Sequence, residues 1–166
     1  MRERLSVFQN LTGDLETAEH VWNGISHAIS RAGREDILKN PQILDLGGGM
    51  GKFSQFLNAE GINTISLDKE NLEVDRTSNP VRANFYQMPF GDATFDIVSG
   101  RGINSDSTNP IDYSKLSGEI ARVLKPRGVF SIFAVVPPSA LELEKYFTRL
   151  GSPDDEFPTL WQKKVM

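Results

Sequence analysis

A turn with four glycines in five positions follows a short apolar segment of this chain. The apolar segment contains Ile43 and Leu44 and is typical of a buried central strand in a parallel sheet. Glycine is needed where the backbone takes a positive φ or where a ligand approaches the main chain closely. A helix beginning after the turn would point unpaired N–H groups at such a ligand. The pattern predicts a nucleotide-type site at the carboxyl end of a first strand.

The spacing of the glycines separates three kinds of nucleotide site. The dinucleotide fingerprint Gly-x-Gly-x-x-Gly fails because Lys52 stands where the third glycine is required. The phosphate loop fails because Leu46 replaces its first glycine and Phe53 its hydroxyl residue. What fits is an acid followed by alternating glycines, Asp45-x-Gly47-x-Gly49-x-Gly51. This pattern resembles the first motif of the class I S-adenosylmethionine-dependent methyltransferases. A glycine-rich connection without a ligand is the alternative.

Composition bounds the rest of the interpretation. The chain has 166 residues, 39% of them hydrophobic and 24% charged, as expected of one globular domain. A net charge of −4 argues against nucleic acid as the main partner. The chain lacks cysteine, a membrane-length apolar run and a signal-peptide core, so we expect a cytoplasmic protein without a membrane partner or metal.

An amphipathic helix is expected between Asp14, as its N-cap, and Gly33, as its end. Its apolar residues recur at spacings of three and four: Leu15, Ala18, Trp22, Ile25 and Ile29. Both histidines of the chain, His20 and His27, fall outside this stripe and are expected on the surface. We expect residues 1–40 to form an arm and this helix, packed on or over the site, and residues 41–166 to form the cofactor-binding domain.

After a helix over residues 52–60, a second strand over residues 62–68 ends on Asp68. Its distance from Asp45 suits the ribose-binding acid of a βαβ nucleotide unit. A carboxylate accepts a hydrogen bond from each of two adjacent ribose hydroxyls. The alternative is that Asp68 caps a short helix beginning at Lys69.

A third strand is expected over residues 80–85. The segments Met88-Pro89-Phe90 and Phe95-Asp96-Ile97-Val98 resemble the methyltransferase family again. The resemblance places Asn84 where the family commonly has an adenine-contacting acid. Its amide oxygen still suits the adenine amino group, although weaker binding is expected. Phe85 either lies against the adenine ring or packs in the core.

The end of the fourth strand, at Ser99, faces the methionine part of the cofactor in the resembling family. Gly100 and Gly102 suggest close backbone approach there, and Arg101 binds a carboxylate or is a solvated loop residue. No catalytic residue is identified. Three polar side chains near the expected mouth are more typical of loop surface: Tyr86, Asp106 and Tyr113.

The C-terminal part of the chain continues the alternation of helix and strand. A helix is marked by Tyr113, Leu116, Ile120 and Val123, and residues 119–128 resemble a structural turn of the family with Arg127 in a glycine position. A strand over residues 129–136 follows. Ser139 and Glu142 predict a capping box for a helix through Leu150, and residues 160–166 a last strand. The short C-terminal segment leaves scarcely room for the final hairpin of the family, so six or seven strands are expected.

These motifs predict an α/β fold, a doubly wound, mostly parallel sheet with helices on both faces. The resemblance implies transfer of a methyl group from S-adenosylmethionine to an unidentified, small-molecule acceptor. A cofactor-binding but non-catalytic partner subunit is the alternative, and a homodimer is a further possibility. An NAD-dependent oxidoreductase is disfavoured by Lys52. The expected cofactor-binding residues are Asp45, Gly47, Gly49, Asp68, Lys69, Asn84, Phe85 and Ser99.

Overall fold

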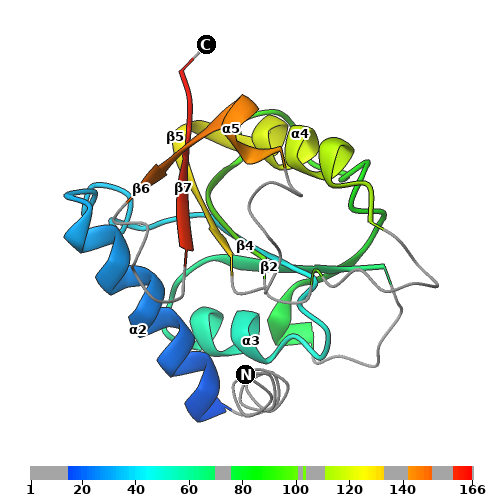
Figure 1. The fold of residues 1–166 in the computed structure, drawn as a ribbon. Coiled ribbons are helices and arrows are strands. Elements are labelled where there is room, and N and C mark those ends of the chain that lie inside the picture. Colours follow the sequence, from blue (N-terminus) through cyan, green and yellow to red (C-terminus); the bar gives the residue numbers. More distant parts are fainter. Residues whose placement is uncertain are drawn as a thin grey trace, which may run out of the picture.

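A seven-stranded sheet with helices on both faces forms the part of the chain that the computed structural model describes (Figure 1). The described residues are 15–69, 76–100, 103, 111–132, 142–150 and 159–165. The strands are β1 (Ile43–Leu46), β2 (Thr64–Asp68), β3 (Pro80–Arg82), β4 (Phe95–Gly100), β5 (Leu124–Ile132), β6 (Phe147–Leu150) and β7 (Thr159–Lys163). The helices are α2 (Leu15–Arg31), α3 (Lys52–Ala59), α4 (Tyr113–Val123), α5 (Leu143–Tyr146) and the 3₁₀ turn η1 (Arg76–Ser78).

The strand order β3-β2-β1-β4-β5-β7-β6 places β1 between β2 and β4, with parallel pairing on both sides. Leu44 of β1 lies opposite Ile65 of β2 and Val98 of β4. In the described sheet, β7 is antiparallel to both of its neighbours, β5 and β6, and the other pairs are parallel. The chain order therefore reverses between β1 and β4, which is the switch point where open α/β sheets bind ligands. The predicted doubly wound, mostly parallel fold is confirmed.

Alternate residues of the central strands face two separate cores. Ile43 and Ile97 pack with the apolar residues of α2 and α3, whereas Leu44 and Val98 pack with those of α4. Figure 1 shows α2 and α3 on one side of the sheet and α4 on the other. Both faces of β1 are covered, which explains why all four of its residues are buried.

The amphipathic helix near the N-terminus is confirmed as α2. Ala18, Ile25 and Ile29 are buried against α3 and the sheet, and Gly33 follows the helix with φ of 67°. A glycine in this conformation is the usual end of a helix. His20 and His27 are exposed, as predicted. The proposed N-cap, Asp14, lies outside the described residues.

The prediction of a helix through Leu150 was wrong. The helix expected to run through Leu150 ends at Tyr146, and Phe147–Leu150 form the edge strand β6. Pairing with β7 satisfies the backbone of this segment, and Phe147 remains in the same core as Leu143. The spacing of these two residues therefore fits a helix although the second one belongs to a strand. The sheet has seven strands, within the six or seven expected.

The expected capping box is also absent from the described part of this segment. Glu142 precedes α5 with φ of 45° and makes no cap hydrogen bond; its carboxylate accepts a hydrogen bond from the Ser114 hydroxyl at 2.9 Å. Ser139 lies outside the described residues.

The turn inside β5 contains a residue in a left-handed conformation. Arg127 has φ of 62°, and its carbonyl accepts a hydrogen bond from Nη1 of Arg34 at 3.2 Å. This conformation costs a non-glycine residue about 1 kcal/mol. Gly128, which follows, is packed tightly, because a Cβ there would lie 2.9 Å from the Lys125 carbonyl oxygen.

We therefore expect Arg127→Gly to stabilise the fold by about 0.5–1 kcal/mol, since it removes the strained φ and keeps the carbonyl that Arg34 binds. Gly128→Ala is the matched control at the neighbouring position and should destabilise the fold. Urea unfolding of both variants measures the two free energies. A loss of stability in Arg127→Gly would show that its side chain contributes more than the strain costs.

Candidate functional site

The glycine turn lies at the carboxyl end of β1, directly at the switch point of the sheet. The N–H groups of Gly47 and Gly48 donate to the Leu67 carbonyl at 2.8 and 3.3 Å, which fastens the turn to β2. Gly47, Gly49 and Gly51 have φ of 73°, 54° and 69°. This is the region that side chains disfavour, so the alternating glycines of the motif are explained by the backbone path.

Buried polar side chains form a floor beneath the turn. A Cβ on Gly48 would lie 2.2 Å from the Ser66 hydroxyl and 2.7 Å from Oδ2 of Asp45. Asp45 has no exposed surface, and the Ser54 hydroxyl donates to its Oδ2 at 3.2 Å. Asp45, proposed from the sequence as a cofactor-binding residue, is therefore placed where it would act by supporting the turn.

The other side of the turn is open among the described residues. No atom of theirs beyond the adjacent residues lies within 4 Å of a Cβ built on Gly49. The Gly49 N–H donates to Oδ2 of Asp68 at 3.0 Å, which joins the end of β2 to the turn. The structure thus brings together Gly49 and Asp68, the two features that carried the sequence prediction. An open glycine surface beside a fixed carboxylate is a cradle that fits a nucleoside-containing cofactor.

Asn84 and Phe85 follow β3 at the same edge of the sheet. Oδ1 of Asn84 accepts the Tyr86 N–H at 2.9 Å, and the Asn84 carbonyl accepts the Gln87 N–H at 3.1 Å. Asn84 is exposed, whereas Phe85 is half-buried against the core that contains α4. Both interpretations of Phe85 remain compatible with this position. The amide of Asn84 also shapes the loop, a role that the sequence did not reveal.

Ser99 is completely buried, and its hydroxyl has no hydrogen-bond partner among the described residues. It lies opposite Asp45 on β1 and Ser131 on β5, and the Ser131 hydroxyl is likewise unpaired there. Direct contact between Ser99 and a cofactor is a poor fit to this burial. Lys69 is exposed at the end of β2. Arg101, Gly102 and Asp106 lie outside the described residues.

Tyr86 has a structural role in the loop after β3. Its hydroxyl accepts the Asp112 N–H at 2.8 Å, and Asp112 caps α4 by accepting the Lys115 N–H at 3.1 Å. Tyr113 begins the helix and is half-buried. The hydroxyl of Tyr86 thus connects the segment beside the proposed adenine site to the start of α4.

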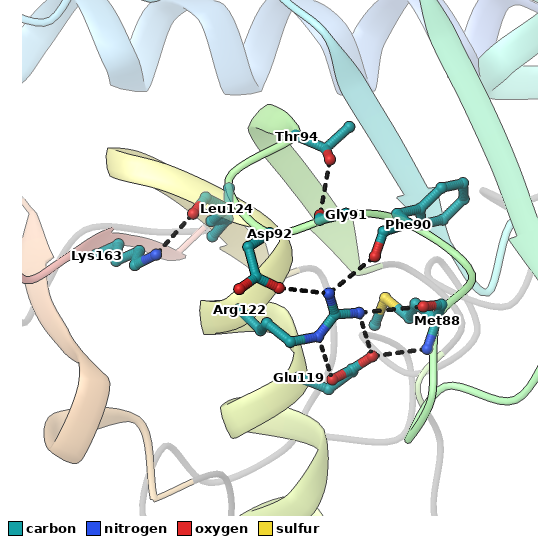
Figure 2. A network of polar contacts seen from close by, with 9 residues as sticks. All are labelled: Met88, Phe90, Gly91, Asp92, Thr94, Glu119, Arg122, Leu124 and Lys163. Atoms are coloured by element: carbon teal, nitrogen blue, oxygen red, sulfur yellow. Dashed lines mark hydrogen bonds and ion pairs between the residues drawn. The ribbon is translucent and has the colours of Figure 1, made fainter.

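A network of charged groups holds the next part of the same loop to the last turns of α4 (Figure 2). Arg122 donates to the carbonyls of Met88 and Phe90 at 3.0 and 2.8 Å. It also pairs with Glu119 at 2.7 Å and Asp92 at 2.8 Å. Glu119 accepts the Met88 N–H at 2.7 Å. These contacts were not predicted, although Glu119 and Arg122 stand three residues apart on one helical face.

Comparison with known proteins identifies the family of the chain. Residues 44–132, slightly more than half of the sequence, match the family model described as "Methyltransferase domain". The chain belongs to this family. The resemblance seen in the glycine motif is confirmed.

Two curated relatives illustrate the range of the family. The chain is 37% identical over 107 residues to a ubiquinone/menaquinone biosynthesis C-methyltransferase of Haemophilus ducreyi, covering 55% of this chain and 40% of that protein. It is 31% identical over 120 residues to a sterol 24-C-methyltransferase of Schizosaccharomyces pombe, covering 64% and 31%. The chain spans less than half the length of these relatives.

Solved structures show the same fold at low sequence identity. A TehB-like S-adenosylmethionine-dependent methyltransferase from Corynebacterium glutamicum aligns with a TM-score of 0.62 and 16% identity over 90% of this chain and 98% of that one. A 1,6-didemethyltoxoflavin-N1-methyltransferase from Burkholderia thailandensis, solved with S-adenosylhomocysteine, aligns with a TM-score of 0.55 and 15% identity over 99% and 90%.

Among the described residues, every helix is too short or too polar to span a membrane. Within the same residues, no three His, Asp or Glu side chains are grouped as a metal ion would require.

The network around Arg122 predicts a dependence of stability on pH. Hydrogen bonding from Arg122 holds the pKa of the Glu119 carboxyl below its ordinary value of 4.5, against the opposing effect of burial, and the Met88 N–H acts in the same direction. A pKa lowered by folding adds stability that is complete above the unfolded value and is lost as the pH falls through the folded value. Glu119→Gln should therefore flatten the decline of unfolding free energy below pH 4.5. Urea titrations at a series of acid pH values measure this slope, and parallel curves for the two proteins would contradict the prediction.

Proposed function

We propose that the chain transfers the methyl group of S-adenosylmethionine to a small-molecule acceptor. The observation that carries this proposal is the open surface at Gly49 beside Asp68, at the switch point of a methyltransferase-family sheet. The sulfonium of the bound cofactor supplies an activated methyl group. The task left to the protein is proximity and orientation, so a general base is not required.

In the proposed pocket, the methionine, ribose and adenine parts of the cofactor lie at the ends of different strands. The methionine part lies over the glycine turn, where Gly49 leaves room for it. Asp68 accepts the ribose hydroxyls, and the Gly49 N–H that donates to its Oδ2 keeps the carboxylate in place. Asn84 and Phe85 hold the adenine from the neighbouring strand. Asp45 supports the turn from below.

Relatives and charge support a small-molecule acceptor. The relatives include sterol, ubiquinone/menaquinone and glycine/sarcosine/dimethylglycine methyltransferases. The net charge of −4 is unsuited to a nucleic-acid backbone. These observations favour a small organic acceptor without identifying the atom that is methylated.

A second candidate function is cofactor binding without turnover, as a partner subunit of an active methyltransferase. The specific observation in its favour is Asn84, an amide at the position where the resemblance expects an acid. Incubation with methyl-labelled S-adenosylmethionine and a small-molecule extract distinguishes the two. Label appearing in extract compounds supports transfer, whereas calorimetric binding of S-adenosylhomocysteine without any transfer supports the partner subunit.

Asp68 provides the sharpest test of ribose recognition. Asp68→Ala should weaken binding of S-adenosylhomocysteine by roughly 30- to 1,000-fold, because charge-assisted bonds to the ribose are lost. Asp68→Asn keeps one acceptor for the Gly49 N–H but loses the charge, so it should still lose much of this affinity. Calorimetry measures both constants. A stable Asp68→Ala protein with wild-type affinity would remove ribose recognition from the proposal.

Gly49 tests whether the cofactor lies on the open side of the turn. Asparagine tolerates a left-handed conformation better than most residues, so Gly49→Asn should fold while its side chain occupies the proposed ligand space. Binding of S-adenosylhomocysteine should fall by about 100-fold or more. Gly33→Asn is the matched control, because Gly33 also has a positive φ and open surroundings but follows α2. Equal binding by both variants would show that the turn has only a structural role.

A further inference from the structure

The loop between β3 and β4 contains few backbone hydrogen bonds of its own. Within residues 84–90 they are two, from Gln87 N to Asn84 O at 3.1 Å and from Phe90 N to Met88 O at 2.8 Å. The second of these bonds closes a tight turn across Pro89, which has no N–H of its own to donate. Backbone bonds to neighbouring elements fasten the two ends of the loop, from Ala83 to the Asp68 carbonyl and from Ala93 and Thr94 to carbonyls at the end of α4. Between these ends, side chains from elsewhere supply further hydrogen bonds.

Arg122 supplies the missing hydrogen bonds from α4 (Figure 2). Its guanidinium reaches the carbonyls on both sides of Pro89, those of Met88 and Phe90, while Glu119 accepts the Met88 N–H. The two side chains thus bind both polar groups of Met88. Figure 2 shows the guanidinium lying between the loop carbonyls and the two carboxylates.

Of the two carboxylates bound to Arg122, that of Glu119 forms the stronger ion pair. The side chain of Glu119 is 13% exposed, whereas that of Asp92 is 79% exposed. Solvent therefore weakens the ion pair between Arg122 and Asp92 far more than the pair between Arg122 and Glu119. Glu119 binds two nitrogens of the guanidinium, Nε at 2.9 Å and Nη2 at 2.7 Å. A planar guanidinium held in this way is fixed in orientation, and its remaining donors point at the loop.

We propose that Arg122, oriented by Glu119, is a positioning residue for the adenine end of the cofactor site. It fixes the loop that carries Asn84 and Phe85, the two residues assigned above to adenine. This inference rests on the proposed function. It also joins two sequence motifs, since the Met-Pro-Phe segment and the helix before the Lys-Pro-Arg-Gly turn form one interlocked unit.

The proposal predicts a loss of base recognition. Arg122→Lys keeps the charge, but a single ammonium group cannot reproduce the planar fork that binds two carbonyls and a carboxylate. With the loop displaced, Asn84 no longer meets the base edge in the right geometry. The variant should bind S-adenosylhomocysteine about tenfold more weakly, and its preference for that ligand over S-inosylhomocysteine should shrink. The inosine analogue differs at the base edge alone.

Arg34→Lys is the matched control for loss of a well-bonded arginine. Arg34 is also buried and binds Asp36, Gln162 Oε1 and the Arg127 carbonyl, but none of these belongs to the loop after β3. We expect it to lower the melting temperature and to leave both dissociation constants at wild-type values. Glu119→Gln disturbs the same loop through the other side chain of the network. It should reproduce the smaller base preference if Arg122→Lys does not fold.

Calorimetry with both ligands, well below the melting temperatures, decides among the outcomes. A smaller base preference in Arg122→Lys or Glu119→Gln, with Arg34→Lys unchanged, supports the positioning role. Equal weakening of the two ligands, wild-type affinities with only a lower melting temperature, or a wild-type protein without base preference each overturns it. Failure of the wild-type protein to bind either ligand would instead contradict the proposed function.

Discussion

The path of the backbone over the buried floor of β1 and β2 is the constraint on which the rest of the site depends. Gly48 has no room for a side chain above Ser66 and Asp45, and the glycines beside it need positive φ values. The side chains of Ser66 and Asp45 pack against one side of the turn, and the Leu67 carbonyl binds its N–H groups. The opposite side of the turn is left to a ligand. Asp45 lies buried beneath the turn, where it accepts a hydrogen bond from Ser54, whereas Asp68 accepts the N–H of Gly49 at the edge of the turn.

Sequence reasoning succeeded where one local segment determines the structure. The glycine spacing, the stripe of α2 and the acid at the end of β2 each follow from neighbouring residues, and all three elements formed as predicted. It failed at β6 because Leu143 and Phe147 enter the same core from a helix and from a strand. Only the pairing with residues of β7, ten to sixteen positions further along the chain, makes that segment a strand.

The site was predictable only in part for the same reason. Asp68 and Gly49 follow from a known spacing, and the structure places them in contact. The burial of Ser99 could not be predicted, because it depends on how far the elements packed on both faces of the sheet cover the carboxyl end of β4. Glu119 and Arg122 carry an ordinary helical spacing, and their contact with Met88 arises from packing of two segments that are distant in sequence.

The two sides of the site differ in the contacts that hold them in place. The turn proposed to face the methionine part is fixed by backbone hydrogen bonds and by glycine conformations. The loop proposed to hold adenine is instead fixed to α4, through the Arg122 side chain at one end and through a hydrogen bond from the Asp112 N–H to the Tyr86 hydroxyl at the other. The helix α4 thus offers a physical connection between the two ends of the loop after β3.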